Sequence, residues 1–283
     1  MQPRKDLLAT LPVELLYEIH FNAASEALPL TCRRLHDIFK KATPTVHADY
    51  LIARYVDLPT SRRQGLITYA LRFPLCTPSV LAALLERPSF PHHQHPAPST
   101  DTGTPTANHD HYPDYGPPEL PKRLFRQLSP SGAEVLPLLH FLYSSGSKSG
   151  SSVQQRMTPP DADSHDGYPL AHAVSAGAVP LVRFLLDHGA SPRRRDALAV
   201  RIAIKRKDLA LVRLLVEPPD APPDERRTGK RRRLADRVQV STEMLNLAMM
   251  CRACYIAEYL MNEKGCVPDL TTFSLLSVLK SKD

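Results

Sequence analysis

The chain has 283 residues, with 28 prolines, no tryptophan and 42% hydrophobic residues, a composition that predicts one or two domains with modest cores between irregular segments. No run approaches the roughly 18 apolar residues of a membrane span, and the charges of Arg4, Lys5 and Asp6 argue against a secretory signal. The formal net charge is +7, but six basic residues lie within residues 226–233, so we expect no broadly basic face elsewhere. Five cysteines, an odd number without a framework spacing, predict reduced thiols and a cytosolic or nuclear location.

Residues 1–46 are predicted to form a small helical bundle. Pro12 suits the first turn of a helix, where its missing N–H costs nothing, and apolar residues follow at spacings of three and four. The opening signature is Leu11-Pro12, Glu14-Leu15 and Ile19, and the closing half is Leu28, Leu30, Cys32, Arg33 and Ile38. With these residues the segment resembles an F-box, with Leu35 where that family usually has tryptophan. The resemblance implies docking on the Skp adaptor of cullin-RING ubiquitin ligases through Leu11, Pro12, Leu15, Leu16, Ile19, Leu28 and Leu30. The alternative is a helical cap that only shields the repeats that follow.

The middle of the chain alternates short apolar pieces with polar segments. We expect a degenerate helix pair within residues 47–87 and degenerate ankyrin-like helices within 122–143. Residues 88–121 hold nine prolines with few aliphatic residues and are interpreted as a disordered Pro/His-rich insertion. Residues 144–165 are rich in serine and glycine and are interpreted as a flexible linker.

The stretch DGYPLAHAVSAGAVPLVRFLLDHGASP, residues 166–192, has the punctuation of two short helices. Pro169 and Leu170 open the first helix, Ala173 lets facing helices approach, and Gly177 and Gly189 supply positive φ at the two chain reversals. The stretch resembles one nearly complete ankyrin repeat, with Ala171 at the family's histidine position. The resemblance implies a helical solenoid.

One repeat cannot bury its own apolar face, so neighbours are required. Aligning Ala173 with Ala203 and with Ala248 brings residues 198–216 and 244–269 into the same pattern. These copies carry Lys207 and Arg252 where the mid-repeat glycine is expected. We therefore predict an all-α fold with ankyrin repeats over residues 166–283, against the alternative of generic amphipathic helix pairs. With the degenerate pieces the array has about five units, and residues 270–281 form a capping helix.

The segment 217–236 is predicted to be a basic loop inserted between repeats, because four prolines precede its run of charges. Such a run is typical of nuclear-import signals, and the alternatives are a solvated loop and, least expected, a nucleic-acid contact. The import residues would be Arg226, Arg227, Lys230, Arg231, Arg232 and Arg233.

These features together predict a protein-binding adaptor. If the F-box interpretation holds, the array recognises an unidentified protein target of a ubiquitin ligase, with Arg193, Arg194 and Arg195 as possible contacts. The alternative is a nuclear scaffold or regulator without a ligase role. We expect no enzyme, cofactor or metal site, because no nucleophile, base and orienting residue can be assembled. The CxxC formed by Cys251 and Cys254 also lacks a fourth ligand at zinc-finger spacing.

Overall fold

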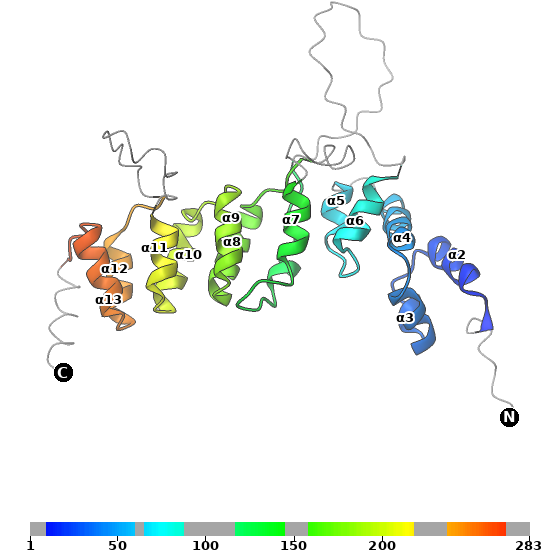
Figure 1. Ribbon diagram of the computed structural model, residues 1–283, viewed down its shortest axis with the longest axis horizontal. Helices are drawn as coiled ribbons and strands as arrows, with labels where there is room; N and C mark the ends of the chain where they lie inside the picture. Colours follow the sequence, from blue (N-terminus) through cyan, green and yellow to red (C-terminus); the bar gives the residue numbers. More distant parts are fainter. Residues whose placement is uncertain (1–9, 60–64, 88–116, 145–157, 218–236, 270–283) are drawn as a thin grey trace, which may run out of the picture. The chain divides into compact units, whose positions relative to one another are not determined.

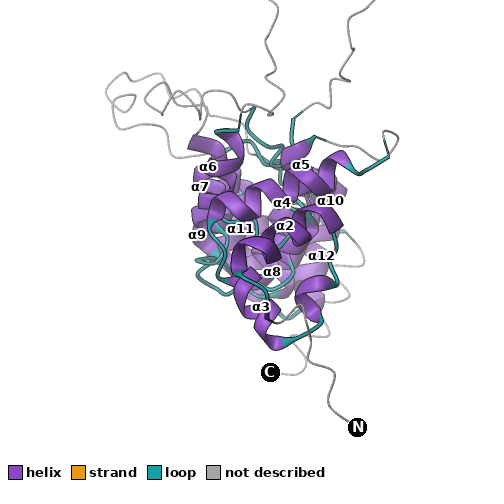
Figure 2. Cartoon of the chain, turned by 90° about the vertical axis from the view of Figure 1, so that its right-hand side faces the viewer, coloured by secondary structure: helices purple, strands orange, loops and turns teal. Residues whose placement is uncertain are grey.

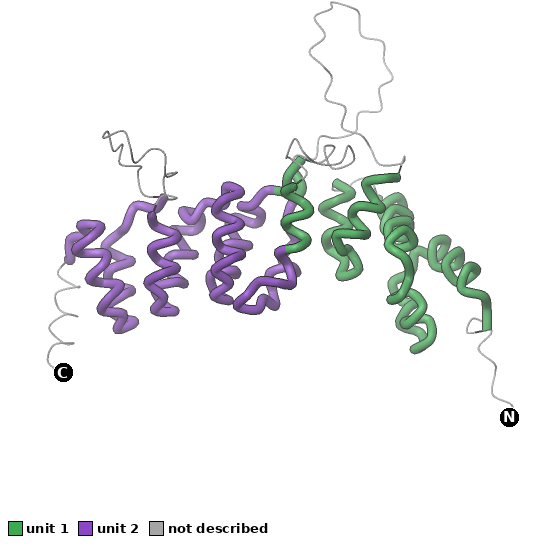
Figure 3. The backbone as a smooth tube through the Cα atoms, viewed as in Figure 1, with its two compact units in different colours: residues 1–118, 137–160 green, residues 119–136, 161–283 purple. Residues whose placement is uncertain are grey.

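The computed structural model describes residues 10–59, 65–87, 117–144, 158–217 and 237–269. Within these ranges the secondary structure is helical, without a β-strand (Figure 2). A single parallel bridge joins Glu119 and Asp161. The predicted all-α fold is thus confirmed for the described part of the chain. The residues fall into two compact units (Figure 3): unit 1 comprises 1–118 with 137–160, and unit 2 comprises 119–136 with 161–283.

Unit 1 begins with the segment that was predicted to form a small helical bundle. Its helices are α2 (Val13–Ala23), the 3-10 turn η1 (Leu28–Leu30), α3 (Arg33–Lys40), α4 (Pro44–Val56), α5 (Leu66–Ala70), α6 (Pro78–Leu85) and α7 (Leu136–Ser144), whose first residue lies in unit 2. Leu16, Leu35 and Phe39 form the buried core between α2 and α3. Leu35, at the family's tryptophan position, is therefore a core residue here.

Helix α4 binds the segment to the rest of unit 1, and the sequence pattern had not indicated it as a separate helix. The ring of His20 stacks on Tyr50 of α4, with 4.0 Å between ring centroids. The Tyr50 hydroxyl donates to the carbonyl of Ser25 (3.3 Å), and Arg54 pairs with Glu26 (2.6 Å). Helices α5 and α6 lie within the predicted pair at 47–87, but α6 packs mainly on α4.

Unit 2 is a stack of helical hairpins (Figure 1). After the 3-10 turn η3 (Lys122–Phe125), the hairpins are α8 (Ser164–Ala176) with α9 (Val179–Asp187), α10 (Arg194–Lys205) with α11 (Leu209–Val216), and α12 (Thr242–Met250) with α13 (Cys254–Glu258) and the π-helical turn η6 (Tyr259–Glu263). The first helices pack on one another, α8 on α10 and α10 on α12, and α11 packs on α13. This is the arrangement of a repeat solenoid.

The three hairpins share one loop geometry. Gly177 has φ 76°, and the two residues aligned with it, Lys207 and Arg252, also adopt positive φ, 59° and 51°. In each case the residue donates its N–H to the third residue back, and the next N–H reaches the fifth back, which is the Schellman motif. The bonds that reach five residues back are Ala178 to Ala173, Asp208 to Ala203 and Ala253 to Ala248. The acceptor alanines are fully buried.

The entries to the first two hairpins also match. Three consecutive residues, His165 to Gly167, have φ between 55° and 77°, and Arg195 to Ala197 have φ between 51° and 54°. The right-handed part of each helix follows, so Pro169 lies in the first regular turn of α8. Left-handed φ costs an L-residue about 1–2 kcal/mol. The entry to the second hairpin has three such residues, Arg195 to Ala197, so tertiary contacts must stabilise it.

Two predicted boundaries are corrected. The insertion at 88–121 ends before Leu120, which is fully buried and donates its N–H to the Ser164 hydroxyl (2.9 Å). The linker at 144–165 likewise ends before Ala162 and Ser164, which are buried. Apolar burial explains both differences, because the chain is already packing on unit 2. Four predictions lie outside the described residues: those for 88–116, for 145–157, for the basic loop from residue 218 with all six import residues, and for the tail from residue 270.

Candidate partner-binding surfaces

The predicted adaptor-binding residues do not share one surface. Leu16 is 1% exposed in the bundle core, whereas Leu15 is 45% exposed. The helical repeat explains the split: Leu16 and His20 lie four residues apart on the inner face of α2, while Leu15 and Ile19 lie four residues apart on its outer face. The inclusion of Leu16 in the contact surface is therefore corrected.

The outer face of α2 is an open apolar groove of about 480 Å³, lined by Leu11, Leu15, Glu18, Ile19, Asn22 and Ala23. Pro12 is exposed directly before the helix, and Leu30 is 77% exposed on η1. Leu28 packs against the bundle core, and so does Leu11 at the edge of the groove. The surface that could take a partner helix is thus centred on Leu15.

His20 is the buried ionisable group of this bundle. Its ring lies between Phe39, with 4.2 Å between centroids, and Tyr50, and its Nδ1 has no hydrogen-bond partner. Burial, followed by the nearby His47 and Arg54, lowers the pKa of His20 from 6.5 to about 4. The bundle therefore contains a neutral imidazole at pH 7.

The predicted ankyrin residues occupy structural positions in the first hairpin. Pro169, Leu170, Ala173 and Leu185 are buried. Gly177 and Gly189 have positive φ of 76° and 92°. In the neighbouring hairpins the position of Leu185 is filled by Leu215 and Leu260, which are also fully buried.

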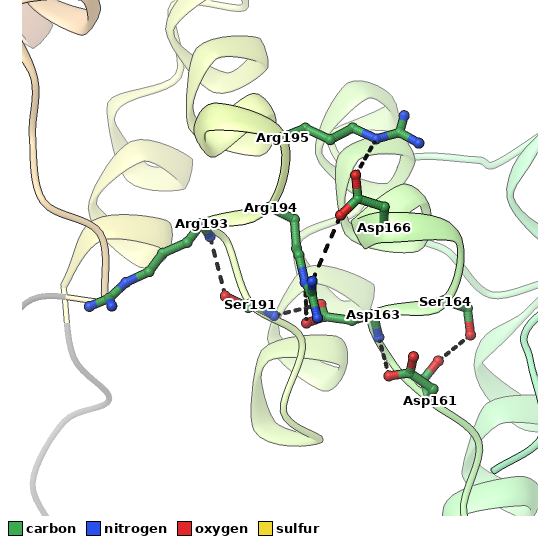
Figure 4. A network of polar contacts seen from close by, with 8 residues as sticks. All are labelled: Asp161, Asp163, Ser164, Asp166, Ser191, Arg193, Arg194 and Arg195. Carbon is green, nitrogen blue, oxygen red and sulfur yellow. Dashed lines mark hydrogen bonds and ion pairs between the residues drawn. The ribbon is translucent and has the colours of Figure 1, made fainter. Parts of the chain in front are cut away.

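The predicted target contacts, Arg193 to Arg195, take part in a network between successive hairpins (Figure 4). Arg194 Nε donates to Asp163 Oδ2 (3.0 Å), and this hydrogen bond, with the charge of Asp163, raises the pKa of Arg194. Arg195 Nε donates to Asp166 Oδ2 (3.0 Å). Arg193 Nε donates to the carbonyl of Arg237 (2.6 Å), toward the third hairpin. All three side chains keep exposed surface, but their charges already serve contacts within the array.

Asp163, the carboxylate that accepts from Arg194, was not predicted as a site residue because it lies in the predicted linker. Its Oδ1 accepts the backbone N–H of Ser191 (2.8 Å), and its side chain is only 11% exposed. The 30-residue spacing of the first two repeats was a signal that could have found it, because Asp163 lies one repeat before Arg193. One carboxylate therefore joins the entry loops of two hairpins.

A groove of about 180 Å³ runs between α8 and α10, and it is bounded at one end by Asp166, Arg194 and Arg195. Its walls include Tyr168 and His172 of α8, whose rings stack with centroids 4.0 Å apart, and Leu198 and Ile202 of α10. The groove combines half-buried apolar side chains with a charged end, a mixture that suits a peptide ligand.

The composition of the whole chain conceals how basic α10 is. Residues 193–207 contain seven basic residues and one acidic residue. Besides the entry arginines, Arg206 donates to the carbonyl of Ser175 (2.6 Å) at the end of α8, where the helix dipole favours a cation. Arg201 and Lys205 are exposed.

Among the residues that the structure describes, no group of three or more His, Cys, Asp or Glu side chains lies together as a metal site. Within the same ranges no helix has the length and apolar content needed to cross a bilayer.

Comparison with known families matches the ankyrin repeat to residues 167–197, which cover most of the first hairpin and the entry of the second. With the repeated hairpin geometry, this match supports an ankyrin-repeat protein. The ankyrin repeat is typically a non-enzymatic protein-interaction module, so the match supports a role in protein binding. No curated protein and no solved structure matched the chain.

Proposed function

We propose that this chain is an interaction adaptor in which the α2 surface binds a Skp-type adaptor and the ankyrin array binds a protein target, as in a substrate receptor of a cullin-RING ubiquitin ligase. The observation that carries the proposal is the outer face of α2. Leu15 is 45% exposed beside the half-buried Ile19, although the inner face already supplies the bundle core.

A helix that only caps a repeat array needs one apolar face, turned toward the array, and a polar face toward solvent. Helix α2 already covers α4 through His20, so a simple cap would carry polar residues at the position of Leu15. An additional apolar stripe at four-residue spacing is what a partner groove recognises in helix-in-groove binding. This difference favours docking over capping.

The test is capture of a purified Skp-type adaptor by the full chain and by the double variant Leu15→Glu with Ile19→Glu. Each buried anchor typically contributes about 2 kcal/mol, so loss of both lowers affinity by roughly three orders of magnitude. The control is Val56→Glu, which places one such charge on another exposed apolar residue of unit 1, 59% exposed on α4. Leu16 is left intact because its substitution would damage the core.

Capture by wild type and by the Val56 variant, with loss in the double variant of unchanged helix content, supports the proposal. If the wild-type chain does not capture the adaptor, the segment is a cap, and the nuclear scaffold without a ligase role takes its place.

For localisation, the basic run at 226–233 supports import into the nucleus from the cytoplasm, because clustered lysine and arginine residues are the feature that import receptors read. Replacement of residues 230–233 by alanine should shift a fluorescent fusion toward the cytoplasm. An unchanged distribution would leave the run as a solvated loop.

A further inference from the structure

Two cations on the exposed side of α10, Arg201 and Lys205, differ from the other basic residues of 193–207. Arg201 and Lys205 are exposed, and neither makes a hydrogen bond or an ion pair with another described residue. Arg193, Arg194 and Arg195 are engaged in the entry network, and Arg206 closes the end of α8. Arg201 and Lys205 are therefore available to a ligand.

Of the three hairpins, only the middle one carries cations at the positions of Arg201 and Lys205. The residues aligned with Arg201 are Ala171 in α8 and Asn246 in α12, and those aligned with Lys205 are Ser175 and Met250. A solenoid needs no cation at these positions for its own packing, since the neighbouring repeats have none. The pair is thus a local feature of α10 and a candidate determinant of specificity.

The cations border an apolar surface. Leu198 and Ile202 are half-buried, and each lies three residues before one of the cations on the same helix face, Leu198 before Arg201 and Ile202 before Lys205. Both also line the groove between α8 and α10. A ligand that satisfied Arg201 and Lys205 would therefore lie beside a recess able to take an apolar side chain.

We infer that this face binds an acidic segment of a partner protein, with carboxylates opposite Arg201 and Lys205 and an apolar side chain in the α8–α10 groove. The inference rests on the proposed protein-binding role of the array and adds the chemistry of its partner. Residues one helical turn apart have Cβ atoms about 5–6 Å apart, and alternate side chains of an extended peptide are about 6.7 Å apart. Two carboxylates at alternate positions match this spacing.

A nucleic acid fits less well. Its phosphates follow one another along the whole strand and need cations spread along their path. Here the half-exposed carboxylate of Asp166 lines one end of the groove and would face part of that path. An acidic peptide places its charges at two points and keeps apolar residues for the groove.

The experiment selects binders of the full-length protein from a library of random 12-residue peptides displayed on phage. The wild type, the variant Arg201→Glu with Lys205→Glu, and the control Arg183→Glu are compared. Arg183 is an exposed arginine on α9, without a hydrogen bond or ion pair to another described residue. Selected peptides are then synthesised and titrated by fluorescence anisotropy, alongside a single-stranded 12-nucleotide RNA probe.

We expect the wild type and the Arg183 variant to select peptides enriched in aspartate and glutamate next to an apolar residue. The double charge reversal should lower the affinity of those peptides about tenfold or more and shift selection toward lysine and arginine. Binding should weaken with added salt, because exposed charge pairs are screened.

If the wild type selects peptides without acidic enrichment, and the double variant binds them equally well, the inference fails while the array remains a protein-binding module. If no peptide is selected by any of the proteins, both the inference and the binding role of the array are contradicted. Tight RNA binding that is lost in the double variant, without acidic peptides, would replace the peptide by a nucleic acid.

Discussion

The left-handed loop positions of the second and third hairpins offer a test by stabilisation. Lys207 and Arg252 have φ of 59° and 51° where the first hairpin has Gly177. An L-residue in this conformation costs about 1–2 kcal/mol, whereas glycine adopts it freely. Replacing Lys207 or Arg252 by glycine should therefore stabilise the array.

The magnitude follows from two opposing terms. Removal of the side chain relieves about 1–2 kcal/mol of backbone strain in the folded state. The greater freedom of glycine in the unfolded chain lowers the free energy of unfolding by about 0.4–1 kcal/mol. The net gain is about 0.5–1 kcal/mol per site. The Tyr255 hydroxyl donates to the backbone carbonyl of Lys207, so the substitution keeps this bond. The two loops belong to different hairpins, and the effects should add.

Urea unfolding followed by circular dichroism gives the change in the free energy of unfolding. The matched control is Lys205→Gly, two residues earlier but in the right-handed helix, which should destabilise by about 1 kcal/mol. Gly177→Ala should also destabilise by about 1 kcal/mol, because alanine would have to adopt φ 76°. If Lys207→Gly destabilises as much as Lys205→Gly, the shared loop geometry of the hairpins is refuted.

Three further outcomes are expected. Leu185→Asp buries an unpaired charge at a fully buried site, so thermal unfolding of the array should lose its cooperativity, and an unchanged melting curve would mean that the repeats are misaligned. Because the pKa of His20 is about 4 in the folded chain, below its ordinary 6.5, its stabilising contribution is full above pH 6.5 and falls by about 2–3 kcal/mol toward pH 4. The loss should be smaller in His20→Phe when urea midpoints are compared across that range. Asp163→Ala should lower the unfolding free energy by about 1–2 kcal/mol, and Asp163→Asn, which keeps an acceptor for Ser191, should lower it by less in the same titration.

The repeated hairpins were predictable from the sequence, because small and apolar residues recur in the same order in each of them. Ala173, Ala203 and Ala248 align by eye and are all fully buried. The loop geometry was less accessible, since Lys207 and Arg252 have no intrinsic preference for left-handed φ. Tertiary packing of the hairpin imposes that conformation.

The surfaces were harder to predict than the fold. Spacing of three and four residues marks a helix but does not say which of two neighbouring stripes faces inward, so Leu15 and Leu16 could not be separated before the bundle was seen. Asp163 escaped notice because a serine-rich segment precedes it, and its role depends on a contact with Ser191, 28 residues away. Charge summed over the chain likewise hid the local excess on α10.

We expect one chain to hold a Skp-type adaptor at α2 and an acidic protein segment at α10 simultaneously. Surface plasmon resonance with immobilised adaptor tests it directly: the full-length chain is bound first, and an acidic peptide selected by the array is then injected. We expect peptide binding on the chain-loaded surface and none on the bare adaptor surface, with a loss of the second signal for Arg201→Glu with Lys205→Glu. Failure of the chain to bind the adaptor, or equal peptide signals with and without the chain, would contradict the account.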